Sequence, residues 1–307
     1  MSPVPDAEPA PLTLRGRRFD ASRPAVMAII NRTHDSFYAP ARHVDLDDAL
    51  ARLDQVVDEG ADIVDVGAVR AGQEGEHVSA EMEVERLTPF LREARLRHPD
   101  VILSVDTWRS SVVRAVAALD IDLVNDTWAG HDPALAPAAA LAGLGVVCSH
   151  TGGLPPRTDP VAVSYPPEPD GVVRDVVRRL AAAASAALSA GVPRERILLD
   201  PTLDFGKTTR HSLTLVRHTA EVVALGFPVL QAISRKDFVG ETLDVPADER
   251  LFGSLAATAV SAWLGATVFR THDVLATRQT LDMVASIRGD RPPTLAVRGE
   301  PMQEEGA

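Results

Sequence analysis

The chain has 307 residues, 45% of them hydrophobic and only 4% aromatic, which suits one large globular domain with an interior of aliphatic side chains. Its net charge of -12 argues against nucleic acid or an anionic membrane as a partner. A single cysteine, Cys148, excludes an intrachain disulfide and a Cys-rich metal site. No signal peptide or long apolar run is evident, so we expect a cytoplasmic protein.

Short runs rich in valine, isoleucine and leucine recur along the chain, and we interpret them as β-strands. They are continuously apolar rather than alternating, which is typical of strands in a parallel sheet that is covered on both faces. The eight predicted strands are Ala25–Ile30, Ala61–Val66, Val101–Val105, Asp122–Val124, Gly145–Cys148, Arg196–Leu199, Phe227–Ile233 and Ala266–Phe269.

Segments with helical periodicity separate these runs. The predicted helices are Asp45–Glu59, Ala80–His98, Trp108–Leu119, Gly171–Ala190, Arg210–Leu225, Ala247–Leu264 and Val274–Ile287. This alternation favours a (β/α)8 TIM barrel with parallel strands, and a doubly wound open sheet is the alternative. We expect a single barrel domain over 22–288, with flexible tails at 1–21 and 289–307. The stretch 152–170 carries six prolines and no periodicity, so we expect a mobile flap there.

Nearly every predicted strand ends in a polar residue. These residues are Asn31, Asp65, Asp106, Asn125 with Asp126, Ser149 with His150, Asp200, Ser234, and Arg270 with His272. In a barrel such ends converge on the face that holds the active site. Individually, many of them also fit helix caps or loop-solvating side chains. As a set they offer acceptors for a nitrogen-rich heterocycle beside a cationic cluster for a phosphorylated group.

Lysine is rare in this chain. Only Lys207 and Lys236 occur among 31 basic residues, so the remaining 29 are arginines. A chain that uses arginine so widely suggests a specific need for an ammonium where lysine is kept. Codon bias with two accidental survivors is the alternative.

The order and spelling of six motifs resemble the dihydropteroate synthase family over about residues 25–290. They are Asn31-Arg32-Thr33-His34-Asp35-Ser36-Phe37, Ser104-Val105-Asp106-Thr107, Asn125-Asp126, Asp200-Pro201-Thr202-Leu203-Asp204-Phe205-Gly206-Lys207, Ser234-Arg235-Lys236 and Arg270-Thr271-His272-Asp273-Val274. Several spellings are similar to the diverged second subfamily of actinobacteria, whose members are regarded as poor or inactive synthases.

The resemblance implies a pterin-binding barrel that joins p-aminobenzoate to 6-hydroxymethyl-7,8-dihydropterin diphosphate with the help of Mg²⁺. It implies that the pterin is held by Asp106, Asn125, Asp200 and Lys236, and the diphosphate by Asn31, Arg270 and His272, with Asn31 near the metal. By the same resemblance Asp35 lies in the substrate-binding first loop, and Phe37, Ser234 and Lys236 border the aminobenzoate site. Catalysis is assigned to Lys236, Arg270, His272 and Asp106. Lys207 lies just past Asp200, on the turn into a helix, and is interpreted as structural or as a support to the site residues. A homodimer is expected from the family alone.

Several loops depart from the family pattern. In the first loop Arg32 and His34 stand where the family has a valine and a proline, and the segment Ser149-His150-Thr151-Gly152-Gly153 replaces the usual His-Met-Gln-Gly. The second loop reads Asp65-Val66-Gly67-Ala68-Val69-Arg70-Ala71-Gly72, is about two residues shorter, and lacks a threonine and a proline that the family uses. Arg70 stands near the place of the family's arginine and is a candidate to bind diphosphate. Asp204 replaces a glycine, which is unfavourable near a diphosphate unless the carboxylate faces away or binds metal.

The loops change while the pterin residues remain, so we expect a pterin-binding paralogue with weak or no synthase activity. One alternative is a working synthase in which Arg32, His34 and Arg70 compensate for the lost residues. A second is a non-catalytic pterin-binding partner or regulatory subunit. A methyltetrahydrofolate-dependent transferase is less favoured, because it needs neither the cationic cluster nor the Lys236 motif.

Overall fold

The computed structural model describes residues 10–32, 45–69, 77–158, 163–166 and 170–298. Its main sheet has eight parallel strands in the order β8-β7-β6-β5-β4-β3-β10-β9. The strands are β3 (Ala25–Asn31), β4 (Ile63–Gly67), β5 (Ile102–Asp106), β6 (Leu123–Asp126), β7 (Gly145–Ser149), β8 (Ile197–Asp200), β9 (Leu230–Ala232) and β10 (Val268–Thr271). A parallel bridge between Leu199 and Val229 joins the two end strands. The sheet therefore closes into the predicted (β/α)8 barrel, and the open-sheet alternative is wrong.

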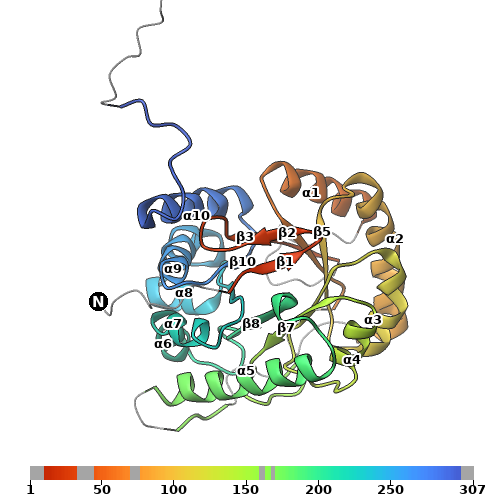
Figure 1. The fold of residues 1–307 in the computed structure, drawn as a ribbon. Helices are drawn as coiled ribbons and strands as arrows, with labels where there is room; N and C mark the ends of the chain where they lie inside the picture. The colour runs from red at the N-terminus through yellow and green to blue at the C-terminus, as the bar shows by residue number, and fades with distance from the viewer. Residues whose placement is uncertain (1–9, 33–44, 70–76, 159–162, 167–169, 299–307) are drawn as a thin grey trace, which may run out of the picture.

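A ring of helices surrounds the strands (Figure 1). The helices are α1 (Leu46–Asp58), α2 (Ala80–Arg97), α3 (Ser110–Val116), α4 (Leu135–Leu141), α5 (Gly171–Ser189), α6 (Thr209–Arg217), α7 (Thr219–Val223), α8 (Asp237–Leu243), α9 (Leu251–Trp263) and α10 (Val274–Arg288). The sequence did not predict α4 and α8, which have seven residues each. The predicted helix Arg210–Leu225 is divided at His218 into α6 and α7.

Part of the segment predicted as a tail at 1–21 is instead a packed hairpin. Strands β1 (Leu12–Leu14) and β2 (Arg17–Phe19) form an antiparallel hairpin, which lies across one end of the barrel in Figure 1. Leu12, Leu14 and Phe19 are almost completely buried and join the inner cluster at the amino-terminal end of the strands. Three-residue strands give too short a pattern to recognise, and only the closed barrel provides the apolar surface that the hairpin covers.

A buried carboxylate anchors this end of the molecule. Asp62 accepts hydrogen bonds from Arg17 of the hairpin, from Arg23 at 3.0 Å and from Arg278 of α10. The backbone N–H of Val26 donates to the same carboxylate at 3.1 Å. These arginines therefore hold the hairpin, β3 and α10 together at the amino-terminal end of the barrel.

The pleat of the strands divides each strand's side chains between two environments. Ile63, Ile102, Leu123, Val147 and Leu198 belong to the inner cluster of the barrel. Their neighbours one residue later pack outward against the helices. Because side chains alternate with a period of two, the residues two and four positions further along each strand also face inward. This parity places Asp65, Asp106, Asn125, Ser149 and Asp200 inside the carboxyl-terminal half of the barrel.

Two predicted features of the loops can be compared with the structure. Described residues of the flap 152–170 contain no helix or strand before Asp170, but they pack closely on the next loop, where Tyr165 Oη donates to Gly206 O at 2.7 Å. Residues 289–298 of the predicted C-terminal tail follow the end of α10 without helix or strand. No helix in the described part of the chain is long and apolar enough to cross a membrane.

Candidate functional site

A buried carboxylate on β4 organises the interior of the site. Asp65 is fully buried and accepts hydrogen bonds from Ser104 Oγ at 2.6 Å, Asn125 Nδ2 at 3.0 Å and Arg270 Nε at 2.7 Å. Four strands, β4, β5, β6 and β10, thus contribute to one network. The bond from Asn125 uses an amide hydrogen, so the amide oxygen of Asn125 is left as an acceptor. The sequence marked Asp65 as a strand end but did not assign it to the site.

Arg270 bridges two carboxylates. Its Nη2 atom donates to Asp106 Oδ2 at 2.9 Å, while Nε is held by Asp65. Thr127 Oγ1 donates to the other oxygen of Asp106 at 2.8 Å. Burial raises the pKa of Asp106 to about 7; the positive charge of Arg270 opposes this rise and the negative charge of Asp65 adds to it. Asp106 therefore titrates near neutral pH and can accept or share a proton with a ligand.

Asn125 and Asp126 are adjacent but have different tasks. Asn125 faces the barrel interior, whereas Asp126 accepts the backbone N–H groups of Trp128 at 3.1 Å and Gly130 at 2.7 Å. Burial raises the pKa of Asp126 to about 6, and these N–H groups act in the opposite direction. Asp126 thus shapes the loop after β6, and only Asn125 faces the barrel interior.

The opposite wall of the site comes from the loop after β8. Asp200 is 5% exposed and accepts the N–H of Thr202 at 2.7 Å. Burial raises the pKa of Asp200, and the ammonium of Lys236 is the largest effect that opposes it. Lys236 donates to the carbonyl of Leu203, and its Nζ lies 5.2 Å from the ring centre of Phe205. The lysine is therefore fixed along the edge of the interior beside Asp200.

The two lysines of the chain have separate roles. Lys207 is 2% exposed, and its ammonium donates to the carbonyls of His150 at 2.7 Å, Thr202 at 2.9 Å and Phe205 at 2.8 Å. Three carbonyls match the three N–H bonds of an ammonium. Lys207 thus joins the loops after β7 and β8, in agreement with its interpretation as a structural residue.

Asp204 is held by two neighbouring helices and lies close enough to Lys236 for the two charges to interact. Its Oδ1 accepts from Ser212 Oγ at 3.0 Å, and its Oδ2 accepts from the N–H of Phe238 at 3.3 Å. Both donors lie near the starts of helices α6 and α8. The carboxylate that replaces a glycine of the family pattern therefore connects two helices.

The ends of β9 and β10 supply the cationic side. Ser234 Oγ and His272 Nδ1 are 3.1 Å apart, and the N–H of His272 donates to Ser234 Oγ at 3.2 Å. Burial, followed by the positive charge of Arg270, lowers the pKa of His272 to about 4. His272 is thus a neutral imidazole near pH 7. Arg235, between Ser234 and Lys236, turns outward and pairs with Asp273 at 2.9 Å.

Ser149 is a further residue of the interior that the sequence did not assign to the site. It pairs in register with Asp200, it is 4% exposed, and its hydroxyl has no hydrogen-bond partner in the described part of the chain. Buried hydroxyls normally have a partner, so a ligand or water is expected there. The period-two pattern that includes Val147 could have identified it.

The structure brings together most of the predicted site residues at the carboxyl end of the barrel. Those described are Asn31, Asp106, Asn125, Asp200, Ser234, Lys236, Arg270 and His272. Asn31 ends β3 in register with Gly67, and a Cβ at that glycine would lie 3.6 Å from the Asn31 amide oxygen and 3.7 Å from Asp106 Oδ2. The predicted residues Asp35, Phe37 and Arg70 lie outside the described residues.

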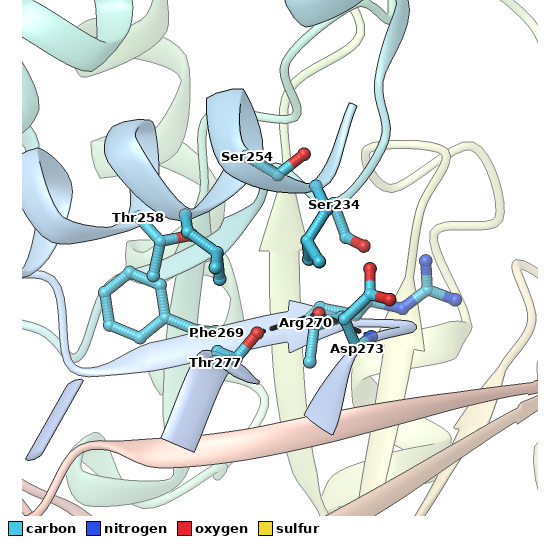
Figure 2. A pocket seen from close by; sticks show the side chains of 10 residues that line it. Ser234, Ser254, Thr258, Phe269, Arg270, Asp273 and Thr277 are labelled. Carbon is cyan, nitrogen blue, oxygen red and sulfur yellow. Dashed lines mark hydrogen bonds between the residues drawn. The ribbon is translucent and has the colours of Figure 1, made fainter. Parts of the chain in front are cut away.

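A small cavity lies behind this site, between α9 and β10 (Figure 2). Its volume is about 10 Å³, which suffices for one water molecule. In Figure 2 the guanidinium of Arg270 extends away from Phe269 and Thr258. The two consecutive residues of β10 thus serve different sides of the sheet, and this cavity is internal packing space, not a ligand site.

Comparisons with known proteins agree with this geometry. Residues 27–272 match the family model described as pterin binding enzyme. The chain is 52% identical over 286 residues to inactive dihydropteroate synthase 2 of Mycobacterium leprae, covering 93% of this chain and 98% of that protein. It is 34% identical over 273 residues to dihydropteroate synthase of Escherichia coli, covering 89% and 95%.

A solved structure also matches along the whole barrel. It is a dihydropteroate synthase from Coxiella burnetii in complex with pteroic acid, with a TM-score of 0.80 and 33% identity, covering 92% of this chain and 100% of that one.

Proposed function

The chain belongs to the family of pterin-binding enzymes, and we propose that its barrel binds a pterin diphosphate while its dihydropteroate synthase activity is weak or absent. One observation carries this proposal. Seven of the eight strands, and the loop after β9, turn polar residues toward the same end of the barrel. Those of β4, β5, β6 and β10 are joined by hydrogen bonds through Asp65 and Arg270, although the second loop departs from the family pattern.

The interior fits the heterocycle. A pterin presents ring N–H and amino donors on one edge, which carboxylate and amide oxygens can accept. Asp106, Asn125 and Asp200 supply such acceptors from β5, β6 and β8, and the ammonium of Lys236 lies beside them. The unpartnered hydroxyl of Ser149 adds one more group that a ligand can satisfy. We therefore assign these five residues to the pterin.

The residues at the carboxyl ends of β3, β9 and β10, which we call the rim, fit the diphosphate. Arg270 carries a permanent positive charge, and Ser234 and His272 lie beside it at the ends of the neighbouring strands. Asn31 supplies an amide oxygen at the same rim, a ligand type that Mg²⁺ accepts when phosphate oxygens complete its shell. Asn31 would thus hold Mg²⁺, which supplies charge neutralisation for the departing diphosphate. The described residues contain no cluster of three or more acidic, histidine or cysteine side chains that could hold a metal alone.

The same residues suit the transferase reaction of the family. Loss of diphosphate leaves positive charge on the pterin, which Asp106 and Asp200 would stabilise, while Arg270 and His272 would stabilise the leaving group. Attack by p-aminobenzoate needs loops that close over the second substrate. We attribute the loss of synthase activity to the shortened loop around Arg70. A relative that is 52% identical is named inactive dihydropteroate synthase 2.

Two rival functions make different predictions. A working synthase predicts turnover that Arg70→Ala abolishes while pterin binding persists. A regulatory subunit predicts binding without turnover and a stable complex with an active synthase.

We also propose that the protein forms a homodimer in the cytoplasm. Helices α9 and α10 pack against each other and expose large apolar side chains, with Phe252 82% exposed and Met283 60% exposed. Such a patch suits an interface with a second copy. Cys148 is the one cysteine of the chain, so the fold has no intrachain disulfide that would need an oxidising compartment. Burial also raises the pKa of its thiol to about 12.

The decisive experiment measures binding and turnover on the same preparation. Isothermal titration with 6-hydroxymethyl-7,8-dihydropterin diphosphate and Mg²⁺ reports binding, and product formation after addition of p-aminobenzoate reports catalysis, beside a known active synthase. We expect binding that Lys236→Ala weakens and turnover far below that of the active enzyme. Turnover comparable to the active enzyme and lost in Lys236→Ala would establish a synthase, and absent binding would refute the pterin site.

A further inference from the structure

The carboxylate of Asp204 departs from the family pattern, and the proposed function assigns it no role. It lies in the loop after β8, where the pattern has a glycine. Its backbone φ is +71°, in the left-handed region that glycine adopts freely and that aspartate and asparagine tolerate better than most residues. A charge has therefore been added to a turn whose backbone conformation suits a glycine.

Contacts on both sides of Asp204 bring it next to Lys236. The lysine donates a hydrogen bond to the carbonyl of Leu203, and its Nζ lies 5.2 Å from the ring centre of Phe205. Asp204 is the residue between these two. Its Oδ2 accepts from the N–H of Phe238, two residues after the lysine, at 3.3 Å. The carboxylate and the ammonium therefore lie in the same small space between the loop after β8 and the start of α8.

Hydrogen bonds fix the orientation of this carboxylate. Ser212 Oγ donates to its Oδ1 at 3.0 Å, and the N–H of Asp204 donates to Ser212 Oγ at 3.1 Å. Both carboxylate oxygens of Asp204 are thus held by the protein. Ordering a long lysine side chain costs conformational entropy, and a counter-ion that is already fixed removes part of that cost from ligand binding.

The charges of the two groups support each other. Both side chains are half-buried. Burial lowers the pKa of Lys236, and Asp204 opposes this effect more strongly than Asp200 does. Burial raises the pKa of Asp204, and the ammonium of Lys236 is the largest effect that opposes the rise. The charged groups that act on the ammonium are Asp200, Asp204, Asp237, Arg270 and Lys207. Among the carboxylates, Asp204 is therefore the main counter-ion of the lysine.

We infer that Asp204 is a positioning residue for Lys236: its carboxylate holds the ammonium charged and against the loop after β8, on the side of the interior assigned to the pterin. This inference rests on the proposed function, which assigns Lys236 to the pterin.

The test follows the two lysines of the full chain by NMR. Lysine labelled with ¹³C at Cε gives two signals, because Lys207 and Lys236 are the only lysines, and Lys236→Met identifies each signal. Asp204→Asn removes the charge with little change in shape and should lower the pKa of Lys236 by about one unit or more. Asp204→Gly, which suits the φ of +71°, should do the same.

Asp237→Asn is the matched control. This carboxylate is next to Lys236 in the chain, but its side chain is 59% exposed and pairs with Arg250. Solvent screens exposed charges, so the pKa of Lys236 should change by less than about 0.3 units in this variant. Circular dichroism of each variant verifies folding.

Isothermal titration with 6-hydroxymethyl-7,8-dihydropterin diphosphate and Mg²⁺ shows whether the pair serves the pterin. If affinity depends on the charged lysine, its loss with rising pH should begin about one unit lower in Asp204→Asn than in the wild type. The ligand and the other titratable groups of the site are common to both proteins, so their effects cancel in the comparison.

The outcomes separate this inference from the proposed function. A pKa of Lys236 that stays within about 0.3 units of the wild type in both Asp204 variants would refute the inference even if pterin binds, because Asp204 would then have only a structural role. An equal shift in Asp237→Asn would also refute it. A shifted lysine with an unmoved pH profile of binding would refute the positioning role. A wild-type protein that binds no pterin would refute the proposed function, while the lysine titration would still decide whether Asp204 is the counter-ion.

Discussion

Replacing Lys207 by methionine tests whether this lysine holds two loops together or serves a ligand. The substitution keeps the length of the side chain but removes the ammonium that donates to the carbonyls of His150, Thr202 and Phe205. Hydrogen bonds from a charged donor contribute about 1.5–3 kcal/mol each. The substitution also removes the cost of burying a charge, so we expect a net loss of about 3 kcal/mol in the free energy of unfolding.

The assay is thermal unfolding followed by circular dichroism. For a domain of this size, 1 kcal/mol corresponds to about 2 °C, so Lys207→Met should unfold about 6 °C below the wild type. Lys236→Met is the matched control: that lysine makes one hydrogen bond to a carbonyl, so its loss should affect pterin binding much more than stability. If Lys207→Met unfolds within about 1 °C of the wild type, the three bonds do not stabilise the fold and the reasoning is refuted.

Four further predictions concern the site and the surface. Arg270→Met leaves Asp106 without its main compensating charge, so the pKa of Asp106 should rise above about 7. A carboxyl whose pKa is raised by folding costs stability as pH rises to the folded pKa, so wild type and variant should change in parallel below about pH 7 and the variant should lose further stability above it, measured by chemical denaturation. Ser149→Ala should weaken pterin binding by about tenfold in titration calorimetry without lowering the unfolding temperature, because the hydroxyl has no described partner in the free protein. The imidazole signal of His272 in NMR should titrate near pH 4, because burial lowers its pKa. The contribution of His272 to stability is therefore complete above about pH 6.5 and is lost as pH falls toward 4. An NMR midpoint near 6.5 would contradict its burial. Phe252→Glu should convert the proposed dimer to a monomer in light scattering, and a wild-type protein that is already monomeric would refute the interface.

Much of the architecture could be predicted from the chain alone. The continuous apolar runs determine strands that are buried on both faces, and each predicted strand overlaps an observed one within a few residues. The resemblance identified the family because its motifs occur at the ends of those strands in a fixed order. The residues with the clearest signal were those where a polar side chain directly follows an apolar run, such as Asp106 and Asp200.

Only the tertiary structure decided which way each polar residue faces and what it contacts. Asn125 and Asp126 are adjacent, but the pleat turns Asn125 toward the barrel interior and Asp126 toward its own loop. Asp204 looked like an obstacle to diphosphate, and it contacts two helix starts instead. The hairpin at Leu12 carries no recognisable pattern because its stability comes from the barrel end that it covers. A local pattern determines strands and helices, since their periods are local, whereas ion pairs such as that of Asp65 with Arg270 join residues about 200 positions apart and exist only once the barrel closes.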